Sequence, residues 1–242
     1  APLPRRGSGN PDGVPRPQAG HGGGPGVRDR AFHAGVVGVE PSADMRKTAE
    51  KKARGVPNVE FRAAFAHATG LDARSADLVT CSQSFHWMEP VGTLAEVDRI
   101  LKPGGIFATY DCDWPPVCSW KAEMAYEKLF GLVKRLERDL PDVRDSFVRW
   151  EKSGHLKRIT DSGYFCYTRE IVFSSTEDCT ADRFLLLAES QGGLQKIRKT
   201  APDAVEAEWE EFRKTVRSLF GEKRFKIRLC YRMRVGVKPE GA

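Results

Sequence analysis

Apolar residues are unevenly distributed along the 242-residue chain. Residues 1–30 hold Gly or Pro at nearly every second or third position, with a single Leu and two Val among them. Such a segment cannot bury enough apolar surface to offset the entropy lost on ordering. We therefore expect residues 1–34 to form a disordered or aberrant N-terminal segment, and a folded domain to occupy residues 35–242.

The folded part begins with a predicted strand, helix and strand. The run GVVGVE at 35–40 is short, apolar and rich in β-branched residues, which is typical of buried parallel strands. Ser42 stands at the N-cap position of a helix predicted over ADMRKTAEKKAR, and Gly55 ends that helix. NVEFR at 58–62 then predicts the second strand.

The alternation of strand and helix continues after residue 75. ADLVTCS at 76–82 predicts a strand, and the following segment places Leu94, Val97 and Leu101 on one face of a helix. GIFATYD at 105–111 predicts the next strand. Alternating strands and helices predict an α/β fold with a doubly wound, mostly parallel sheet.

The second half of the domain is predicted to be mainly helical. Long helices are expected around AYEKLFGLVKRLERDL, TADRFLLLAES and AVEAEWEEFRKTVRSLF, followed by a closing strand KIRLCYRMRVGV. We see no internal repeat. Residues 116–220 are therefore expected to form a helical region of the same domain that covers the substrate.

Ligands of open α/β sheets bind at the carboxyl ends of the strands, so the residues after each strand are candidates for a site. Glu40 follows the first strand, where its carboxylate can accept both ribose hydroxyls of an adenosine cofactor or interact instead with the helix N-terminus. Ala64 and Phe65 follow the second strand, where they can pack on an adenine face or belong to the core.

The segment CSQSFHWMEP carries Phe85, His86 and Trp87 directly after a predicted buried strand. A His-Trp pair there can cover a cofactor and present a polar edge to a substrate, or it can be a capped turn whose Trp fills a helix interface. A solvent-exposed histidine titrates near neutral pH. His86 is therefore a candidate proton acceptor.

A Pro-containing loop is predicted over TYDCDWPPVCSW. It carries Tyr110, Asp111, Asp113, Trp114 and Trp120, which can form an aromatic substrate rim or a stiff packed connection. The two acids have no histidine at metal-ligand spacing, so the sequence predicts no metal site.

Composition narrows the class of protein. A net charge of +6 and a pI near 9.0 come from scattered residues, which is a weak argument for an anionic partner such as a nucleic acid. The six cysteines show no C-x-x-C spacing, which argues against zinc and disulfide scaffolds and favours a reducing cytoplasm. No apolar run approaches the roughly 20 residues of a membrane span, and we identify no signal peptide.

Three stretches in order, VGVEPSADM, ADLVTCSQSFHWMEP and LAEVDRILKPGGIFATYD, resemble the class I S-adenosylmethionine-dependent methyltransferases. The similarity is greatest to the small-molecule, type 11-like branch, and ESQGGLQKIRK and CYRMRVGVK resemble the tail of such proteins. The resemblance implies a Rossmann-like sheet of seven mostly parallel strands, of which the last is antiparallel. It also implies S-adenosylmethionine as the cofactor and a small molecule as the methyl acceptor.

The resemblance assigns roles to residues of this chain. The positions implied for cofactor binding are Glu40, Pro41, Ala64, Phe65, Cys81, Ser82, Phe85 and Trp87. Methyl transfer needs in-line positioning, and it needs a base only where the acceptor must lose a proton. His86 is the first candidate for that base, followed by Asp113 and Tyr110.

The glycine turn of the family departs from the usual pattern in this chain. HGGGPG places Gly22, Gly24 and Gly26 where the cofactor-binding turn is expected. The preceding NPDGVPRPQAG has prolines that a central strand excludes, and VRDRAFHAG is too short for the helix that normally follows. The first strand and helix are therefore expected to be missing or irregular, which exposes the edges of neighbouring strands.

Three other functions remain open from the sequence. A methyltransferase-fold protein that has lost its cofactor turn is favoured by the segment 21–34. A nicotinamide-dependent oxidoreductase is compatible with Glu40, but the FHW segment and the KPGG turn argue against it. A nucleic-acid methyltransferase is suggested only by the pI of 9.0.

Overall fold

The structure is a computed structural model that describes residues 35–144 and 148–241. The expectations for residues 1–34, which include the three glycines of the cofactor turn, lie outside the described residues. The strands are β1 (Val36–Val39), β2 (Val59–Arg62), β3 (Ala76–Ser82), β4 (Leu101–Val117), β5 (Tyr167–Cys179) and β6 (Phe225–Val237). The helices are α1 (Ala43–Lys52), α2 (Pro90–Ile100), α3 (Trp120–Asp139), α4 (Pro141–Arg144), α5 (His155–Asp161), α6 (Ala181–Glu189), α7 (Gly192–Thr200) and α8 (Glu206–Phe220), with 3-10 turns η1 (Phe85–Trp87), η2 (Lys152–Gly154) and η3 (Pro202–Ala204).

The first strand, helix and strand form as predicted, and we call them the β1–α1–β2 unit. The strands pair in parallel, with Val36 opposite Val59. The side chain of Ser42 caps α1 by accepting a hydrogen bond from the backbone N–H of Met45 at 3.4 Å. Gly55, beyond the end of α1, takes a φ of 83°, which favours glycine. None of the residues of α1 is buried.

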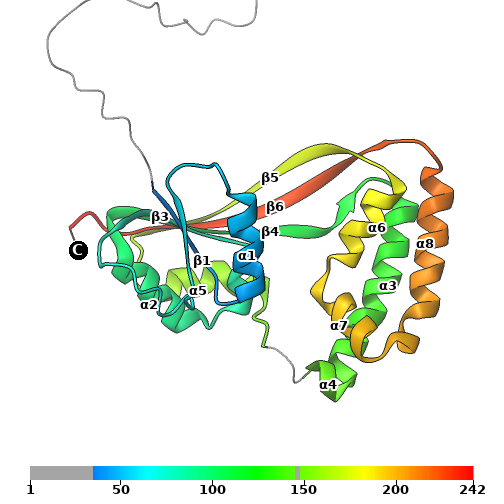
Figure 1. Ribbon diagram of the computed structural model, residues 1–242, viewed down its shortest axis with the longest axis horizontal. Helices are drawn as coiled ribbons and strands as arrows, with labels where there is room; N and C mark the ends of the chain where they lie inside the picture. The colour runs from blue at the N-terminus through cyan, green and yellow to red at the C-terminus, as the bar shows by residue number, and fades with distance from the viewer. Residues whose placement is uncertain (1–34, 145–147, 242) are drawn as a thin grey trace, which may run out of the picture.

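The remaining strands form one sheet in the order β3-β4-β6-β5. β3 and β4 are parallel, whereas β6 runs antiparallel to both of its neighbours. The predicted antiparallel last strand is therefore confirmed, as is the α/β fold class. The three long strands β4, β5 and β6 run from one end of the molecule to the other, with helices gathered at both ends (Figure 1).

The predicted loop over TYDCDWPPVCSW is wrong, because β4 continues through this segment to Val117. Pairing with β6 is regular as far as Asp113, opposite Cys230, and resumes only at Val117, opposite Arg228. The two prolines fall inside this irregularity, where no ladder hydrogen bond is needed from them. An irregular edge thus lets a Pro-containing segment remain in the sheet.

The sequence analysis did not predict β5, α5 or α7. β5 pairs with β6 along its whole length, from Tyr167 opposite Val237 to Cys179 opposite Phe225. Its side chains are mostly exposed on both faces, so it lacks the alternation that marks a half-buried strand. The region 116–220, expected to be helical, therefore also contains a long edge strand.

Two apolar cores lie at the two ends of the long strands. The larger one packs α3, α6, α7 and α8, which we call the helical lobe, around Phe184, Trp209 and Phe212. The three long helices predicted there are confirmed. The smaller core joins α2 and α5 to β3 and β4 through Phe85, Phe107 and other apolar side chains.

The described residues do not form the seven-stranded sheet that the resemblance implied. They contain two separate sheets, because no described strand joins β1 to β3. β1 and β3 therefore each have one edge that no strand among residues 35–144 and 148–241 covers. Leu78 of β3 is 57% exposed.

Candidate functional site

Polar side chains meet just beyond the carboxyl end of β3, where its parallel pairing with β4 ends at Tyr110, the kind of edge at which parallel strands bind their ligands. η1 follows β3 and carries Phe85, His86 and Trp87, which the structure brings together as predicted. Asp111 lies within β4, and its carboxylate Oδ1 is 3.2 Å from Nδ1 of His86. We call His86, Asp111 and His155, with the cations beside them, the strand-end cluster.

The local packing of η1 explains the position of His86. The ring of Phe85 is buried against Phe107 and His155, with ring centroids 5.6 and 4.9 Å away. The backbone carbonyl of His86 accepts a hydrogen bond from the N–H of Trp150 at 2.8 Å. The His86 side chain is thereby buried, whereas Trp87 remains 44% exposed beside it.

Asp111 is a buried carboxylate surrounded by cations. Its Oδ1 lies 3.1 Å from the ammonium of Lys152, and its Oδ2 lies 3.3 Å from Nη1 of Arg234. Burial opposes ionisation, but the His86 ring and the Lys152 ammonium outweigh it and lower the pKa of Asp111 to about 2. Asp111 is therefore ionised at neutral pH.

A second layer of ion pairs fixes Arg234. Glu170 of β5 accepts hydrogen bonds from Arg234 at 2.9 Å and from Arg232 at 2.7 Å. Arg232 also contacts Asp113, at 3.1 Å. Asp113 thus helps to balance the charge of Arg232. Its role as a base stays a prediction.

His155 is the second histidine of the cluster. It begins α5, it is fully buried, and its Nε2 lies 3.9 Å from Oδ2 of Asp111. Burial lowers the pKa of His155 to about 4, against the attraction of Asp111. The imidazole is therefore neutral near pH 7.

Sequence reasoning missed His155, Lys152, Arg234 and Glu170. None of them lies in a recognisable motif, and Arg234 lies more than 120 positions beyond Asp111 in the chain. The only sequence feature that points to Arg234 is the alternation of charged and apolar residues in the closing strand KIRLCYRMRVGV. Strands at the protein surface show the same pattern. Three-dimensional pairing of β4, β6 and β5 is what brings these side chains together.

The predicted cofactor positions among the described residues lie at or just after the carboxyl ends of β1, β2 and β3. Glu40 accepts a hydrogen bond from the N–H of Ser42 through Oε1 at 2.8 Å, and no hydrogen bond to its other oxygen is found within the described residues. Pro41 is exposed, Ala64 is half-buried, and Phe65 is exposed and stacked on His67 at 5.7 Å.

The positions at the end of β3 differ in exposure. Cys81 is buried, and burial raises the pKa of its thiol to about 12, so it is no nucleophile at neutral pH. Ser82 is exposed. Tyr110, a predicted base, pairs through its backbone with Ser82 and Met233.

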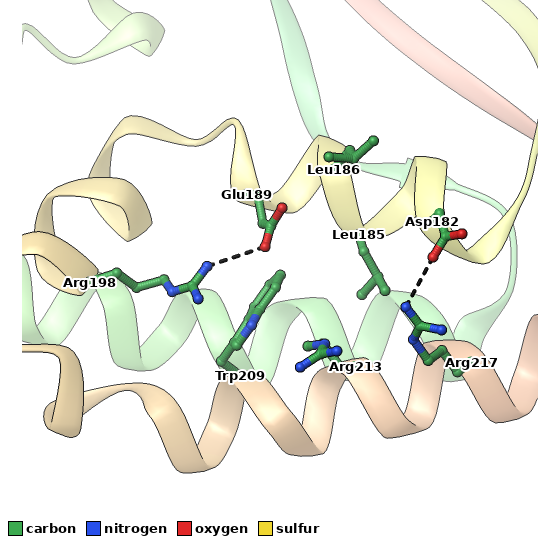
Figure 2. A pocket seen from close by; sticks show the side chains of 8 residues that line it. All are labelled: Asp182, Leu185, Leu186, Glu189, Arg198, Trp209, Arg213 and Arg217. Atoms are coloured by element: carbon green, nitrogen blue, oxygen red, sulfur yellow. Dashed lines mark hydrogen bonds and ion pairs between the residues drawn. The ribbon is translucent and has the colours of Figure 1, made fainter.

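A groove of about 460 Å³ lies elsewhere, between α6 and α8 of the helical lobe. Figure 2 shows that Glu189 is paired with Arg198 and Asp182 with Arg217 along its walls, with Trp209 between them. These arginines already have carboxylate partners. The groove also lies far along the fold from the strand ends, so we do not assign it to the chemistry.

One set of metal-binding side chains stands out among the described residues. A ligand atom each of His86, Asp111 and His155 lies within 4.8 Å of the others. No metal site was expected from the sequence, because Asp111 and Asp113 have no histidine at metal-ligand spacing.

Comparison with known proteins shows which proteins the chain resembles. Residues 18–109 match the family model of a methyltransferase domain, a range that includes the glycine cluster at 21–26. An uncharacterized methyltransferase-like protein of Schizosaccharomyces pombe is 28% identical over 200 residues, which cover 81% of this chain and 70% of that protein. A second uncharacterized methyltransferase of that yeast is 38% identical over 73 residues, which cover 30% of this chain and 28% of the other.

A solved structure shares the fold. A proposed type II methyltransferase from Anaeromyxobacter dehalogenans aligns with a TM-score of 0.60 and 21% identity, covering 85% of this chain and 81% of that one. The architecture is thus that of the Rossmann-like methyltransferases. The domain match over residues 18–109, the relatives and this solved structure together support a class I methyltransferase, and hence an enzyme, by family resemblance. No helix in the described ranges is long and apolar enough to cross a membrane.

Proposed function

We propose that the protein transfers a methyl group from S-adenosylmethionine to a small-molecule acceptor. The observation that carries the proposal is the buried His86–Asp111 contact of 3.2 Å beyond the carboxyl end of β3, in a chain that matches a methyltransferase domain. S-adenosylmethionine would supply an activated methyl group. The residues of this chain would bind the two reactants, orient them and exclude water.

The cofactor side of the proposal rests on Glu40. Its free carboxylate oxygen, at the carboxyl end of β1, is suited to accept hydrogen bonds from ribose hydroxyls. Its other oxygen is held by the N–H of Ser42, which fixes the orientation of the carboxylate. Exposed Phe65, after the neighbouring strand β2, is suited to pack on a purine ring.

The acceptor side rests on the strand-end cluster. A proton held on Nδ1 of His86 would face ionised Asp111, which leaves Nε2 with a lone pair that can take a proton from the acceptor. Because the His86 side chain is buried, only a small group can reach it. This favours a small molecule over a nucleic acid, and the six unpaired cysteines agree with a cytoplasmic setting.

The experiment is a pair of measurements on the full chain with His86→Ala. Calorimetric titration with S-adenosylmethionine should show unchanged affinity, whereas transfer of a labelled methyl group into a panel of small acceptors should fall at least about tenfold. Unchanged transfer would remove His86 from the chemistry. Absence of cofactor binding by the wild-type chain would refute the whole proposal.

A matched pair of variants separates the two roles of Glu40. Glu40→Ala should weaken cofactor binding about tenfold or more, because it removes the proposed ribose contact. Ser42→Ala removes the cap of α1 but leaves the carboxylate in place, so affinity should stay within about twofold. Equal losses in both variants would mean that Glu40 acts only through the start of α1.

A second candidate is a methyltransferase-fold protein without cofactor binding. It is favoured by the uncovered edges of β1 and β3 within the described residues. The same titration decides between the two, since this candidate predicts no heat of binding at any cofactor concentration.

A further inference from the structure

We propose that His86, Asp111 and His155 form a binding site for a divalent transition-metal ion. The three side chains come from η1, β4 and α5, and one ligand atom of each lies within 4.8 Å of the others. All three are nine-tenths buried or more. This proposal is independent of the proposed methyl transfer, because it concerns only the binding of the metal ion.

Unpartnered atoms point into this site. Nδ1 of His86, Oδ1 of Asp111 and Nε2 of His155 are buried and make no hydrogen bond of good geometry, and Oδ1 has only its ion-pair contacts with His86 and Lys152. The contacts of 3.2 Å and 3.9 Å between these side chains have ion-pair distances without hydrogen-bond geometry. A buried polar atom without a partner costs about 1–3 kcal/mol. A single ion that accepts all three lone pairs would remove this cost at the two histidine nitrogens and would replace the contact of Oδ1 with Lys152.

The ligand set selects the kind of ion. Two imidazole nitrogens and one carboxylate oxygen suit zinc, cobalt or ferrous iron, whereas calcium and magnesium prefer sites made of oxygen. Bonds of about 2.0–2.2 Å to such an ion hold neighbouring ligand atoms roughly 3–4 Å apart. The ligand atoms, which lie within 4.8 Å of one another, therefore need to close by roughly 1–2 Å at most, which rotation of the buried side chains would have to provide.

Lys152 is the main competitor of the ion. Its ammonium lies 3.1 Å from Oδ1 of Asp111, the oxygen that the metal would use. The Lys152 side chain is 35% exposed, so it can turn into solvent when the ion enters. Arg234 can remain on the other oxygen, because Glu170 already balances its charge.

Arg158 also has to adjust. Its Nη1 lies 3.3 Å from Nδ1 of His155, and coordination through Nε2 would place the imidazole proton on that same Nδ1. Arg158 would then give up this contact. It would keep its shorter hydrogen bond to the carbonyl of Glu151, at 2.8 Å.

A bound ion would determine which nitrogen of His86 carries the proton. Coordination through Nδ1 leaves the proton on Nε2, so metal-bound His86 has no lone pair for an acceptor proton. A bound metal would thus oppose the proposed base role of His86 and inhibit a transfer that depends on it. Binding itself is measured without any methyl acceptor.

The test is titration of the metal-free full chain with Co²⁺, followed by its visible absorption, with Zn²⁺ added afterwards as a competitor. We expect one site per chain whose absorption Zn²⁺ abolishes. His155→Gln should weaken Co²⁺ binding at least about tenfold, since a ligand is lost. His67→Gln, which changes an exposed histidine outside the cluster, should leave the affinity unchanged.

Lys152→Met gives the sharper result, because it should strengthen Co²⁺ binding, whereas a variant that is merely damaged should bind more weakly. Removing a cation beside the ligand oxygen should tighten Co²⁺ binding about tenfold or more. This partly exposed residue can change without leaving an empty space in the core, so the test survives if His155→Gln fails to fold. The proposal is overturned if wild-type chain and Lys152→Met both fail to bind Co²⁺, if Lys152→Met does not bind more tightly than wild type, or if folded His155→Gln binds as wild type does.

Discussion

The helical lobe and the β1–α1–β2 unit have equally clear sequence patterns, yet only the lobe encloses a core. In the lobe, Trp209 and Phe212 are almost completely buried among other apolar side chains. In the unit, α1 has no buried residue and Val36 of β1 is 55% exposed. The comparison teaches that a local pattern defines an element, whereas its burial depends on neighbours distant in sequence.

The missing neighbour is a strand. β1 pairs only with β2 among the described strands, and β3 pairs only with β4. Parallel strands are normally covered on both faces, and an uncovered strand edge is a liability. The unit is therefore tethered to the rest of the fold mainly through the segment that follows β2, where Thr69 and Leu71 bond to α2.

The largest effect is expected in the helical lobe. Phe212→Ala removes a ring that packs on Tyr126, Phe184 and Trp209, with centroid distances of 6.2, 6.2 and 5.7 Å. The cavity should lower the free energy of unfolding by about 3–5 kcal/mol. Urea unfolding followed by circular dichroism measures it.

The matched substitution in the unit is Phe61→Ala in β2. This ring lies against Gly38 but is only half-buried, so its loss should cost no more than about 1–2 kcal/mol. Equal costs for the two substitutions would mean that the unit has a core as complete as that of the lobe, and the comparison would fail.

Much of the fold could be predicted because its determinants are local. Ser42 caps α1 as expected, and β3 begins and ends at the predicted residues, 76 and 82. β5 could not be predicted, because its partner is the whole of β6 and its own faces are both largely exposed. The run of β4 beyond Asp113 was hidden by prolines that sit in a local irregularity of the ladder.

The site was only half accessible from the sequence. His86 stands in a motif directly after a strand, so its position was predictable. The positions of its partners were not predictable. His155 begins α5, far from His86 in the chain, and Arg234 reaches Asp111 only because β4 and β6 pair antiparallel. Local spacing carries no information about a contact that depends on sheet topology.

A middle-sized effect is expected at the tether of the unit. Glu96 of α2 accepts hydrogen bonds from Thr69 and from Arg99, the latter at 2.7 Å. The Arg99 guanidinium lowers the pKa of the Glu96 carboxyl to about 2, against the effect of burial. Glu96→Gln keeps an acceptor for Thr69 but loses the charge. The free energy of unfolding at pH 7 should therefore fall by about 2 kcal/mol. This is less than the full pKa shift implies, because solvent screens the partly exposed Arg99.

This effect should depend on pH with a definite sign. Because the pKa of Glu96 is lower in the folded state than in the unfolded chain, its contribution is complete above about pH 4.5 and is lost as the pH falls towards 2. Urea unfolding of wild type and Glu96→Gln at several pH values should show two stabilities that converge on acidification. A constant difference across that range would show that the charge of Glu96 contributes nothing.

The smallest effect is expected within the unit itself. Ser42→Ala removes the side chain that accepts from the N–H of Met45 at the start of α1, a loss of about 1 kcal/mol in a typical helix. Because α1 buries no residue, local fraying should absorb much of this loss, and global unfolding should shift by less than that. Hydrogen exchange should instead show faster exchange confined to α1. A full 1 kcal/mol loss in global unfolding would mean that α1 is coupled to the core more tightly than its exposed surface indicates.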